Sequence, residues 1–420
     1  MSNAPSIDQI DLSDMEFWAK PWDERMAAFA TLRRERPIAF FEEPEIEDLP
    51  LPPGPGYYAI TRHADILEMS RTPEVFCSSQ GATSLIDLPD FMLEFFGGMI
   101  NMDDPKHARQ RKIVSANFTP RMLAKAMDDV ERITGNVIDA VADKGEADLV
   151  PEVSAKLPLA FICDMMGIPE SQRDLVFHQS NIILSNGDPD LIPEGEDVLA
   201  AFMQAGGQLA ELMKDLAQHR VDKPTDDLTS ALVNAEIEGE KLSHDELASF
   251  FILLVVAGNE TTRNAISHGV WLLDRNPDQR EIWMNDVEGV TSTAVEEIVR
   301  FATPVIFMRR TATRDATVSG HDFHQGDKCL LFYNSGNRDE AVFDAPDSFD
   351  VLRNPNPHVG FGGPGPHFCL GAHLARREIS VMFRELFRRL PDLHVVRPPD
   401  QLRSSFINGI KHLDVAWTVQ

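Results

Sequence analysis

One cysteine lies where a thiolate would be chemically useful. Cys369 lies near the end of a loop rich in glycine and proline, Phe361–Gly371, and the residues from Ala372 onward have a helical pattern. The dipole and the free N–H groups at a helix N-terminus favour negative charge and lower the pKa of a thiol. The loop glycines also let the backbone approach a flat partner. The pattern predicts a thiolate that binds a metal, and a buried structural cysteine in a turn is the simpler alternative.

Haem iron is the partner that this loop fits, because its thiolate ligand must be an anion held by backbone donors on one side of the macrocycle. The other three cysteines, Cys77, Cys163 and Cys329, are isolated and form no Cys-x-x-Cys motif. The sequence therefore indicates neither a zinc site nor a disulfide framework.

A second candidate lies inside an apolar helix predicted over residues 247–275. The segment Ala257–Thr262, Ala-Gly-Asn-Glu-Thr-Thr, places one glycine and four polar side chains in mid-helix. Glycine costs about 1 kcal/mol there relative to alanine, and polar groups cost more if they are buried without partners. We expect a local deformation that opens a pocket for a diatomic ligand, with Thr261 and Glu260 relaying protons. A partly exposed bend is the alternative.

Four basic side chains could hold two carboxylates. His107 and Arg111 lie four residues apart on one helical face, Arg310 precedes a predicted strand, and His367 lies two residues before Cys369. Arginine and histidine are good donors to carboxylates, and haem carries two propionates. Each residue alone is as simply explained as a surface cation.

A further pair, Glu297 and Arg300, is three residues apart and therefore shares one helix face. Most such pairs are solvated and contribute little. This pair gains meaning only from its place between the other motifs.

Composition limits the possible partners. The 420 residues carry 67 acidic and 39 basic side chains, a formal net charge of −28, which argues against nucleic acid and anionic membrane surfaces. The longest strongly apolar run, Phe250–Ala257, is far shorter than the roughly 20 residues that a membrane span needs. The N-terminus lacks the basic and apolar segments of a signal peptide. We expect a cytoplasmic protein of one domain, residues 1–420, without a linker or internal repeat.

The predicted elements are mainly helical, with a small β part. Apolar residues recur at helical spacing over 121–143, 171–185, 194–220 and 247–275, and helices are also expected over 21–35 and 63–71. A capping box, Ser243–Glu246, precedes the helix over 247–275. Strands are expected over 37–41, 57–61, 316–319, 328–333 and 394–396, and a long irregular segment over 76–100.

In this order and at these spacings, the motifs resemble those of bacterial cytochromes P450 over almost the whole chain. The resemblance implies an α-rich lobe and a β-rich lobe around a buried haem b. Cys369 would then be the axial thiolate, and Thr261 and Glu260 would deliver protons. Propionates would be bound by His107, Arg111, Arg310 and His367.

The chain departs from the family pattern in two places. Phe361 lies eight residues before Cys369, where the family usually has seven, so the loop carries an extra residue. Ser348 stands where the family often has an arginine that joins the Glu297–Arg300 pair. Arg338 or Arg353 could take that place, and the sequence does not decide between them.

The resemblance also implies an activity. P450s put one oxygen atom of O2 into a C–H bond and release the other as water, and the thiolate favours O–O cleavage. Val256–Asn264, Met308–Arg310 and the lengthened loop resemble the actinobacterial group that oxidises terminal methyls of methyl-branched lipids, isoprenoids and sterol side chains. Terpene and alkane hydroxylases share part of the pattern. A haem-thiolate sensor without turnover and a peroxide-driven haem enzyme are the competing classes.

The substrate and the electron donor would each contact further residues of the chain. Apolar residues near the motifs are candidates for the substrate pocket, or for ordinary core: Ile100, Leu253, Val256, Ala257, Val305, Phe307, Phe406 and Ile407. No flavin- or NAD-binding motif occurs, so the resemblance implies a ferredoxin and a ferredoxin reductase as electron donors. A local basic patch could dock the acidic partner, formed by Lys106, Arg109, Arg121, Arg376 and Arg377.

Overall fold

The computed structural model describes residues 5–44, 54–117, 120–184, 197–236 and 239–419. The chain forms two compact units, each assembled from segments far apart in the sequence. Unit 1 comprises Met1–Leu93, Asn276–Ala372 and Gln401–Gly409, and unit 2 comprises Glu94–Arg275, His373–Asp400 and Ile410–Gln420. That 1–420 is one domain stays a prediction.

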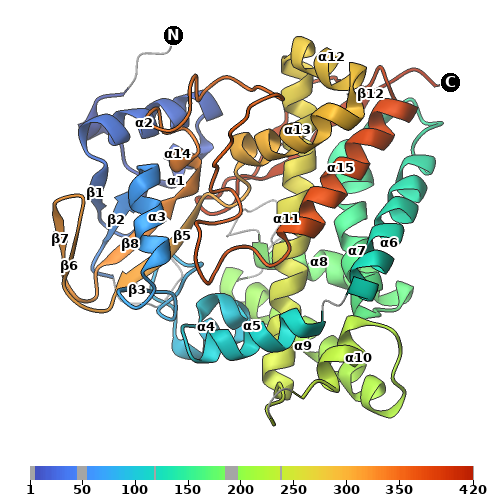
Figure 1. Cartoon of the computed structure of the whole chain (residues 1–420), viewed down its shortest axis with the longest axis horizontal. Coiled ribbons are helices and arrows are strands. Elements are labelled where there is room, and N and C mark those ends of the chain that lie inside the picture. The colour runs from blue at the N-terminus through green and yellow to red at the C-terminus, as the bar shows by residue number, and fades with distance from the viewer. Residues whose placement is uncertain (1–4, 45–53, 118–119, 185–196, 237–238, 420) are drawn as a thin grey trace. The chain divides into compact units, whose positions relative to one another are not determined.

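Unit 1 holds the main sheet of the described chain (Figure 1). Its strands are β1 (Ile38–Phe41), β2 (Tyr57–Ile60), β3 (Phe76–Cys77), β5 (Phe307–Ala312) and β8 (Lys328–Phe332), with β6 (Ala316–Val318) and β7 (His321–Phe323) as a separate hairpin. Its helices are η1 (Ile7–Gln9), α1 (Met15–Ala19), α2 (Trp22–Glu35), α3 (His63–Arg71), α12 (Pro277–Asn285), α13 (Val287–Ala302) and α14 (Tyr333–Gly336).

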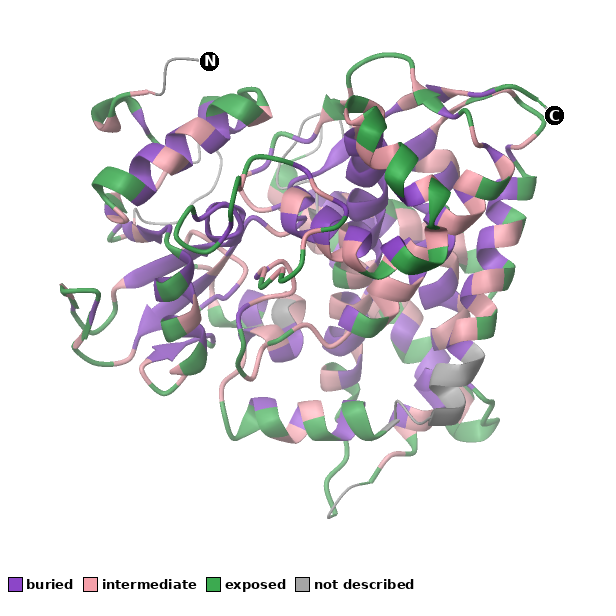
Figure 2. Ribbon diagram, turned by 45° about the horizontal axis from the view of Figure 1, so that its top comes forward, coloured by how far each residue is buried: buried purple, intermediate pink, exposed green. Residues whose placement is uncertain are grey.

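The sheet has the order β1-β2-β8-β5-β3, in which β2 and β8 run parallel and the other pairs are antiparallel. Arg310 of β5 lies opposite Cys329 of β8. All five residues of β8 are buried, and the strands are largely purple in Figure 2. A strand at the centre of a covered sheet needs apolar residues on both faces, which Cys-Leu-Leu-Phe supplies.

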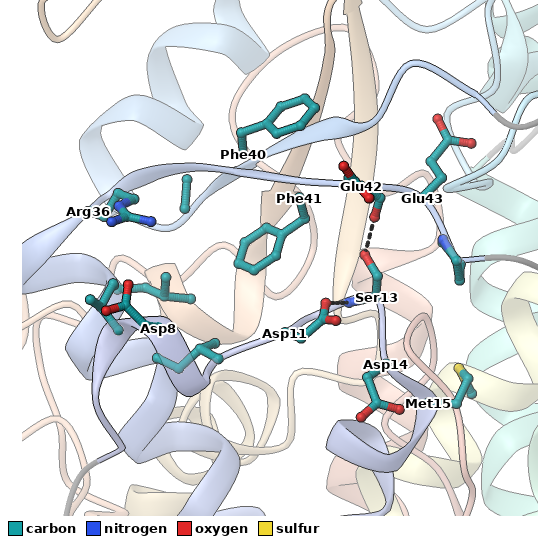
Figure 3. Close-up of a pocket in the computed structure, with 15 residues that line it drawn as sticks. Asp8, Asp11, Ser13, Asp14, Met15, Arg36, Phe40, Phe41, Glu42 and Glu43 are labelled. Atoms are coloured by element: carbon teal, nitrogen blue, oxygen red, sulfur yellow. Dashed lines mark hydrogen bonds between the residues drawn. The ribbon is translucent and has the colours of Figure 1, made fainter.

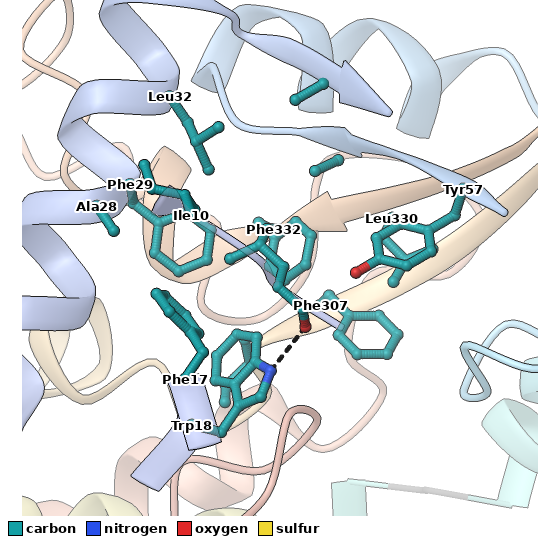
Figure 4. Packing of buried hydrophobic residues seen from close by; sticks show 14 of the residues in the cluster. Ile10, Phe17, Trp18, Ala28, Phe29, Leu32, Tyr57, Phe307, Leu330 and Phe332 are labelled. Carbon is teal, nitrogen blue, oxygen red and sulfur yellow. Dashed lines mark hydrogen bonds between the residues drawn. The ribbon is translucent and has the colours of Figure 1, made fainter. Parts of the chain in front are cut away.

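Aromatic packing holds the N-terminal segment against this sheet (Figure 4). Trp18 stacks on Phe332 of β8 with ring centroids 6.2 Å apart and an interplanar angle of 11°. Phe29 of α2 contacts the same Phe332 ring at 5.2 Å. The Trp18 indole N–H donates to the Leu12 carbonyl at 2.9 Å, so its one polar atom is satisfied within the core.

Unit 2 is mainly helical. Its elements are η2 (Gly98–Asn101), α5 (Lys106–Asn117), α6 (Pro120–Asp139), β4 (Glu146–Asp148), the π-turn η3 (Val150–Ser154), α7 (Lys156–Met166), η4 (Glu170–Gln172), α8 (Arg173–Leu184), α9 (Val198–Asp222), α10 (Leu228–Val233), α11 (His244–Arg275), β9 (His394–Val395), β11 (Ile410–His412) and β12 (Asp414–Ala416). Three elements span the unit boundaries: α4 (Asp90–Gly97), α15 (Ala372–Arg389) and β10 (Asp400–Gln401). Strands β4, β12 and β9 form a small antiparallel sheet.

Helix α11 is the long element of unit 2, and its start was predicted correctly. The Ser243 hydroxyl accepts from the Glu246 N–H at 3.1 Å, and the Glu246 carboxylate accepts from the Ser243 N–H at 2.8 Å. The capping box is therefore formed on both sides. The helix then continues without interruption to Arg275.

Most of the predicted elements are present, and one prediction was wrong. The segment 76–100, expected to be irregular, contains β3, α4 and the start of η2. Arg310 precedes β6, as expected, and itself lies within β5. The predicted helix over 194–220 is α9, and residues 194–196 lie outside the described residues. Among the described residues, no helix is both long and apolar enough to cross a membrane.

Candidate active site

The cysteine loop belongs to unit 1 and is closed by its own backbone. The Cys369 N–H donates to the Phe361 carbonyl at 3.0 Å, and the Phe368 N–H donates to the Gly365 carbonyl at 3.2 Å. The extra residue is thus accommodated inside a closed turn. The Phe361 ring lies beside His358, with ring centroids 5.8 Å apart.

Two glycines of this loop are required by close packing on the end of α3. A Cβ at Gly363 would lie 2.4 Å from the Ser70 hydroxyl, and one at Gly365 would lie 2.3 Å from the Ser70 carbonyl. Gly365 also has a φ of +156°, at the edge of the range that side chains rarely adopt. The glycines therefore fix where the loop, and hence Cys369, is held.

Cys369 differs from the other cysteines in exposure. Cys77, Cys163 and Cys329 are buried, whereas Cys369 is partly exposed. Burial raises the pKa of the Cys163 thiol to about 12 and raises that of Cys329 as well, so these two stay protonated and inert.

Within the described part of the chain, the Leu370 and Gly371 N–H groups form no hydrogen bond. They precede α15, as a thiolate at a helix N-terminus requires.

Two adjacent arginines of β5 have different partners. Arg309 pairs with Asp87 at 2.8 Å. Arg310 is only 5% exposed, donates to the Arg309 carbonyl at 2.8 Å, and forms no ion pair with any residue that the structure describes. A buried guanidinium ordinarily has an anionic partner. Arg310 therefore fits a carboxylate that the described residues do not supply.

Arg310 lies near the cysteine loop. Burial raises the pKa of Tyr333, and the neighbouring Arg310 charge opposes that rise. A Cβ at Gly362 would lie 3.9 Å from the Tyr333 hydroxyl and 3.7 Å from the His367 carbonyl. Unit 1 thus brings Arg310, Tyr333 and the segment Gly362–Cys369 together.

The other two predicted carboxylate ligands lie in α5 of unit 2. His107 is buried, and its Nδ1 lies 3.5 Å from the Asp104 carboxylate. Burial lowers the pKa of His107, and the Arg111 charge on the same helix face acts in the same direction. His107 is therefore a neutral imidazole at pH 7 and Arg111 a permanent cation.

The segment Ala257–Thr262 is part of the continuous helix α11. Gly258 is explained by packing, since a Cβ there would lie 2.6 Å from Ile162 of α7. The Thr261 hydroxyl donates to the Ala257 carbonyl at 2.7 Å, one turn back. Glu260 is buried, its Oε2 pairs with Arg263, and its Oε1 has no hydrogen-bond partner among the described residues. Burial raises the pKa of Glu260, and the Arg263 charge opposes that rise.

The apolar candidates of unit 1 lie together. Val305 and Ile407 form an isolated β-bridge, and the Ile306 N–H donates to the Phe406 carbonyl at 2.8 Å. The Phe307 and Phe406 rings are 5.3 Å apart. Phe307 and Ile407 are fully packed, whereas Val305 and Phe406 keep some exposure. Of these four side chains, Val305 and Phe406 are therefore the ones with exposed atoms that a ligand can contact.

The apolar candidates of unit 2 lie on η2 and α11. A Cβ at Gly98 would lie 3.5 Å from Leu253 Cδ2, so the turn that carries Ile100 packs against this part of α11. Ile100, Leu253, Val256 and Ala257 are each at least partly exposed. Unit 2 thus carries an apolar strip next to the Glu260–Thr261 segment.

The Glu297–Arg300 pair is a buried network. The two Arg300 nitrogens Nε and Nη2 donate to the Glu297 carboxylate, each at 2.7 Å. Arg353 Nε also donates to both Glu297 oxygens, at 3.2 and 3.1 Å, whereas Arg338 bonds the Phe301 carbonyl. Arg353, and not Arg338, is therefore the arginine that joins the Glu297–Arg300 pair, a choice that the sequence left open.

A pocket of unit 1 lies elsewhere, between the N-terminal segment and β1 (Figure 3). It has a volume of about 810 Å³ and is rimmed by acidic side chains, Asp8, Asp11, Asp14, Glu42 and Glu43. None of the predicted site residues lines it. Its acidic rim does not suit an apolar substrate.

The comparison with known proteins decides the family. Residues 93–415 match the family model described as Cytochrome P450. The chain belongs to the cytochrome P450 family. Its fold, mainly α with a small β part, agrees with this, and a Mycobacterium marinum cytochrome P450 in complex with pseudoionone superposes on 99% of this chain and 100% of its own with a TM-score of 0.93 and 41% identity.

Curated relatives of this P450 are hydroxylases. A methyl-branched lipid omega-hydroxylase of Mycobacterium tuberculosis is 49% identical over 416 residues, covering 98% of this chain and 95% of the relative. A steroid C26-monooxygenase of Mycolicibacterium smegmatis is 39% identical over 367 residues, covering 86% and 84%. The protein is a P450 monooxygenase, and the family uses a haem-thiolate cofactor, dioxygen, a lipophilic substrate and a redox partner.

The residues of this P450 fit such a cofactor. Unit 1 supplies a partly exposed cysteine before a helix N-terminus, and a buried arginine, Arg310, that pairs with no carboxylate of the described residues. Unit 2 supplies His107 and Arg111 on one helix face. An anionic metal ligand and several carboxylate donors are the donor set that a haem with two propionates needs.

Sequence reasoning missed Arg263, the partner of Glu260. Its signal was present, because Glu260 and Arg263 have the same spacing as Glu297 and Arg300. The proposed basic patch is also partly occupied: Arg109 pairs with Glu240 and Glu246, and Arg377 pairs with Glu131. The Arg121 side chain lies outside the described residues.

Proposed function

We propose that this P450 binds haem b through the Cys369 thiolate and hydroxylates a terminal methyl group of a methyl-branched lipid, isoprenoid or sterol side chain. The observation that carries the ligand assignment is that Cys369 alone among the four cysteines is not buried, and it ends the glycine loop before α15. The substrate class is supported by the names of the relatives that are 49% and 39% identical.

The cofactor, when bound, supplies the activation of dioxygen. The chain's own contribution is binding, orientation and proton supply. Arg310 and His367 of unit 1, with His107 and Arg111 of unit 2, would bind the propionates as charge-assisted or neutral donors. Arg310 is the donor that the described residues leave without a carboxylate.

Proton delivery falls to α11. Glu260 keeps one carboxylate oxygen without a partner among the described residues. Its pKa is raised toward neutral pH, where a carboxyl can both take up and release a proton. The Thr261 hydroxyl, which donates to Ala257 in this structure, can accept a second hydrogen bond. The two groups would carry the protons that the reduction of dioxygen consumes.

Apolar side chains would hold the substrate and keep water out. Ile100, Leu253, Val256 and Ala257 of unit 2 and Val305 and Phe406 of unit 1 have exposed atoms for this contact, while Phe307 and Ile407 support them from the core. An apolar pocket with few polar groups suits a lipid tail. A terpenoid is the second candidate substrate, because the Mycobacterium marinum P450 of 41% identity is in complex with pseudoionone.

Electrons would come from a ferredoxin and its reductase, in the cytoplasm. Lys106 is exposed at the start of α5, and an acidic ferredoxin would have to compete with Glu131 for Arg377. If turnover required only peroxide, a peroxygenase would be the correct assignment instead.

Purified protein tests this proposal in two steps. Branched fatty acids, terpenoids and sterols are screened for a substrate-induced shift of the haem absorption, and products with ferredoxin, its reductase and NAD(P)H are identified by mass spectrometry. We expect terminal alcohols of a methyl-branched chain, and a sharp loss of coupled turnover in Thr261→Ala. Products oxidised in mid-chain would overturn the regiochemistry, and unchanged coupling in Thr261→Ala would overturn the relay role of Thr261.

A further inference from the structure

A second buried ion pair lies inside the proton-carrying segment of α11. Glu260 and Arg263 are three residues apart, and both side chains are nearly inaccessible, with 1% and 9% of their surface exposed. Arg263 Nη2 donates to Glu260 Oε2. Glu260 Oε1 has no hydrogen-bond partner within the described chain. One oxygen of this carboxylate is therefore held and the other is left for a further partner.

The other arm of Arg263 is held by a neighbouring helix. Arg263 Nη1 donates to the Asn181 side-chain oxygen on α8 at 2.9 Å. The adjacent Ser180 meets α11 one turn earlier, where the Asn259 amide lies 3.5 Å from its hydroxyl. Two consecutive polar residues of α8 thus face the polar turn of α11, and Asn181 fixes the guanidinium that fixes Glu260.

Near neutral pH a guanidinium is a permanent cation with a planar fork of donors, so Arg263 gives Glu260 a fixed charge and a fixed donor. A carboxylate with both oxygens free can rotate and bond in several directions, whereas one held by a planar fork has a single free oxygen in a set direction. Proton transfer depends on such alignment.

We propose that Arg263, held by Asn181, is a positioning residue for proton delivery: it fixes Oε2 of Glu260 and leaves Oε1 to take up and release the proton. The inference rests on the proposed role of Glu260 and deepens it. The relay acid becomes a unit of three residues on two helices.

The electrostatics of the site agree with this arrangement. Burial raises the pKa of Glu260, the Arg263 charge opposes that rise, and the Asn264 amide one turn along acts in the same direction as Arg263. Asn264 Nδ2 forms no hydrogen bond within the described chain, and its influence on this pKa is smaller than that of Arg263. Among the described residues, Arg263 is thus the charge that opposes the rise of the Glu260 pKa.

A purely structural ion pair is the competing explanation, and the test must separate the two. The protonation of Glu260 is read directly from the infrared C=O band of its neutral carboxyl group, titrated with pH in the substrate-free protein. The band is assigned by its loss in Glu260→Gln. That control matters because the chain buries other carboxyl groups too, Glu297 and Glu378 among them.

The test variants are Arg263→Gln, Arg263→Lys and Asn181→Ala, and Arg275→Gln is the matched control on the same helix. Arg275 lies over the Trp271 ring near the end of α11. We expect the infrared midpoint of Glu260 to rise by about 1–3 units in Arg263→Gln, to rise less in Asn181→Ala, and to stay unchanged in Arg275→Gln. Arg263→Lys keeps the charge without the fork, so the midpoint recovers while alignment does not.

Coupled turnover supplies the second measurement. Product formed per NAD(P)H consumed should fall in Arg263→Gln, by up to about 100-fold, with a larger solvent isotope effect on turnover, and should recover only partly in Arg263→Lys. An unchanged infrared midpoint and unchanged coupling in Arg263→Gln would overturn the inference. If that variant does not fold, Asn181→Ala decides in the same way.

The outcome is distinguishable from a failure of the proposed function. If the wild-type protein forms terminal alcohols and Arg263→Gln changes neither the infrared midpoint nor the coupling, the positioning role is refuted and the proposed function is not. If the reduced wild-type protein with carbon monoxide lacks the red-shifted band of a thiolate-ligated haem, the proposed function is refuted. In that case the infrared titration still reports whether Arg263 controls Glu260.

Discussion

Two helices of this P450 carry a buried glutamate followed three residues later by an arginine. The two glutamates differ in how many hydrogen-bond partners the rest of the described chain gives them. Glu297 on α13 accepts from Arg300, Arg353, Asn356 and the Asp350 N–H. Glu260 on α11 accepts from Arg263 and keeps Oε1 without a described partner.

The arginines differ in the same way. Arg300 also donates to the carbonyls of Asn337, Pro346 and Ser348, at 2.8, 2.8 and 3.1 Å. Arg263 donates to Asn181 and leaves its Nε without a partner in the described chain. A fully satisfied buried network fixes structure, whereas leftover hydrogen-bonding capacity is costly and is kept where it serves function. Equal spacing in the sequence thus conceals two different environments, and we infer that the first pair is structural and the second functional.

The largest effect should come from breaking the satisfied pair. Glu297→Ala leaves Arg300 buried without its anion and removes the acceptor that ties 350–356 to α13, so we expect a loss of about 3–5 kcal/mol in the free energy of unfolding. Urea unfolding measures it. Glu288→Ala, an exposed glutamate in the first turn of the same helix, is the control. A Glu297→Ala protein as stable as that control would remove the structural side of the comparison.

A third buried glutamate, Glu378, extends the comparison to a carboxyl that has no cationic partner in the part of the chain that the structure describes. Burial raises the pKa of Glu378 on α15 to about 8, from 4.5 in the unfolded chain, and its Oε2 has no described partner. Between these pH values the folded state binds the proton and the unfolded state does not, so stability falls as pH rises. We expect a loss of about 2–3 kcal/mol from pH 5 to pH 7 through this group. The slope of stability against pH should therefore flatten in Glu378→Gln, and equal slopes for both proteins would contradict the assignment.

Removing the acid of the unsatisfied pair should affect chemistry more than folding. In Glu260→Gln we expect product per NAD(P)H to fall about 10- to 100-fold, since a positioned acid contributes at least that much to proton transfer. The unfolding free energy should fall by less than in Glu297→Ala, because Arg263 keeps an amide oxygen as acceptor. The two variants are compared in the same urea and turnover assays. Full coupling in Glu260→Gln would mean that both pairs are structural.

The smallest effect concerns Arg353, which the structure selects over Arg338 as the third member of the network. Because its Nε is one of several donors to Glu297, Arg353→Ala should cost about 1–2 kcal/mol in urea unfolding. Ser348→Ala is the matched control, since Arg300 and Arg353 bond its carbonyl and not its hydroxyl. If the two variants are equally stable, Arg353 does not belong to the network.

The sequence predicted those parts of the site that local patterns determine. The span of α3, the capping box of α11 and the helix after Cys369 follow from residue order alone. Contacts between distant segments do not. Arg353 reaches Glu297 only because the chain folds back after α13, which no spacing reveals.

Two features of the structure have physical reasons that local patterns do not reveal. Strand β5 was not among the strands expected from the pattern; it carries two arginines, and Asp87 from a distant segment pairs with Arg309. The polar segment 257–262 suggested a local deformation, but α11 is continuous there and Ile162 lies against Gly258. In both cases tertiary contacts override the local signal.

The most direct test is the spectrum of the reduced protein with carbon monoxide, measured for wild type and for Cys369→Ala. The account predicts the strongly red-shifted Soret band of a thiolate-ligated haem in the wild type and its absence in Cys369→Ala, with Cys77→Ala, a buried cysteine, behaving as wild type. The same red-shifted band in the Cys369→Ala protein, or none in either protein, would contradict it.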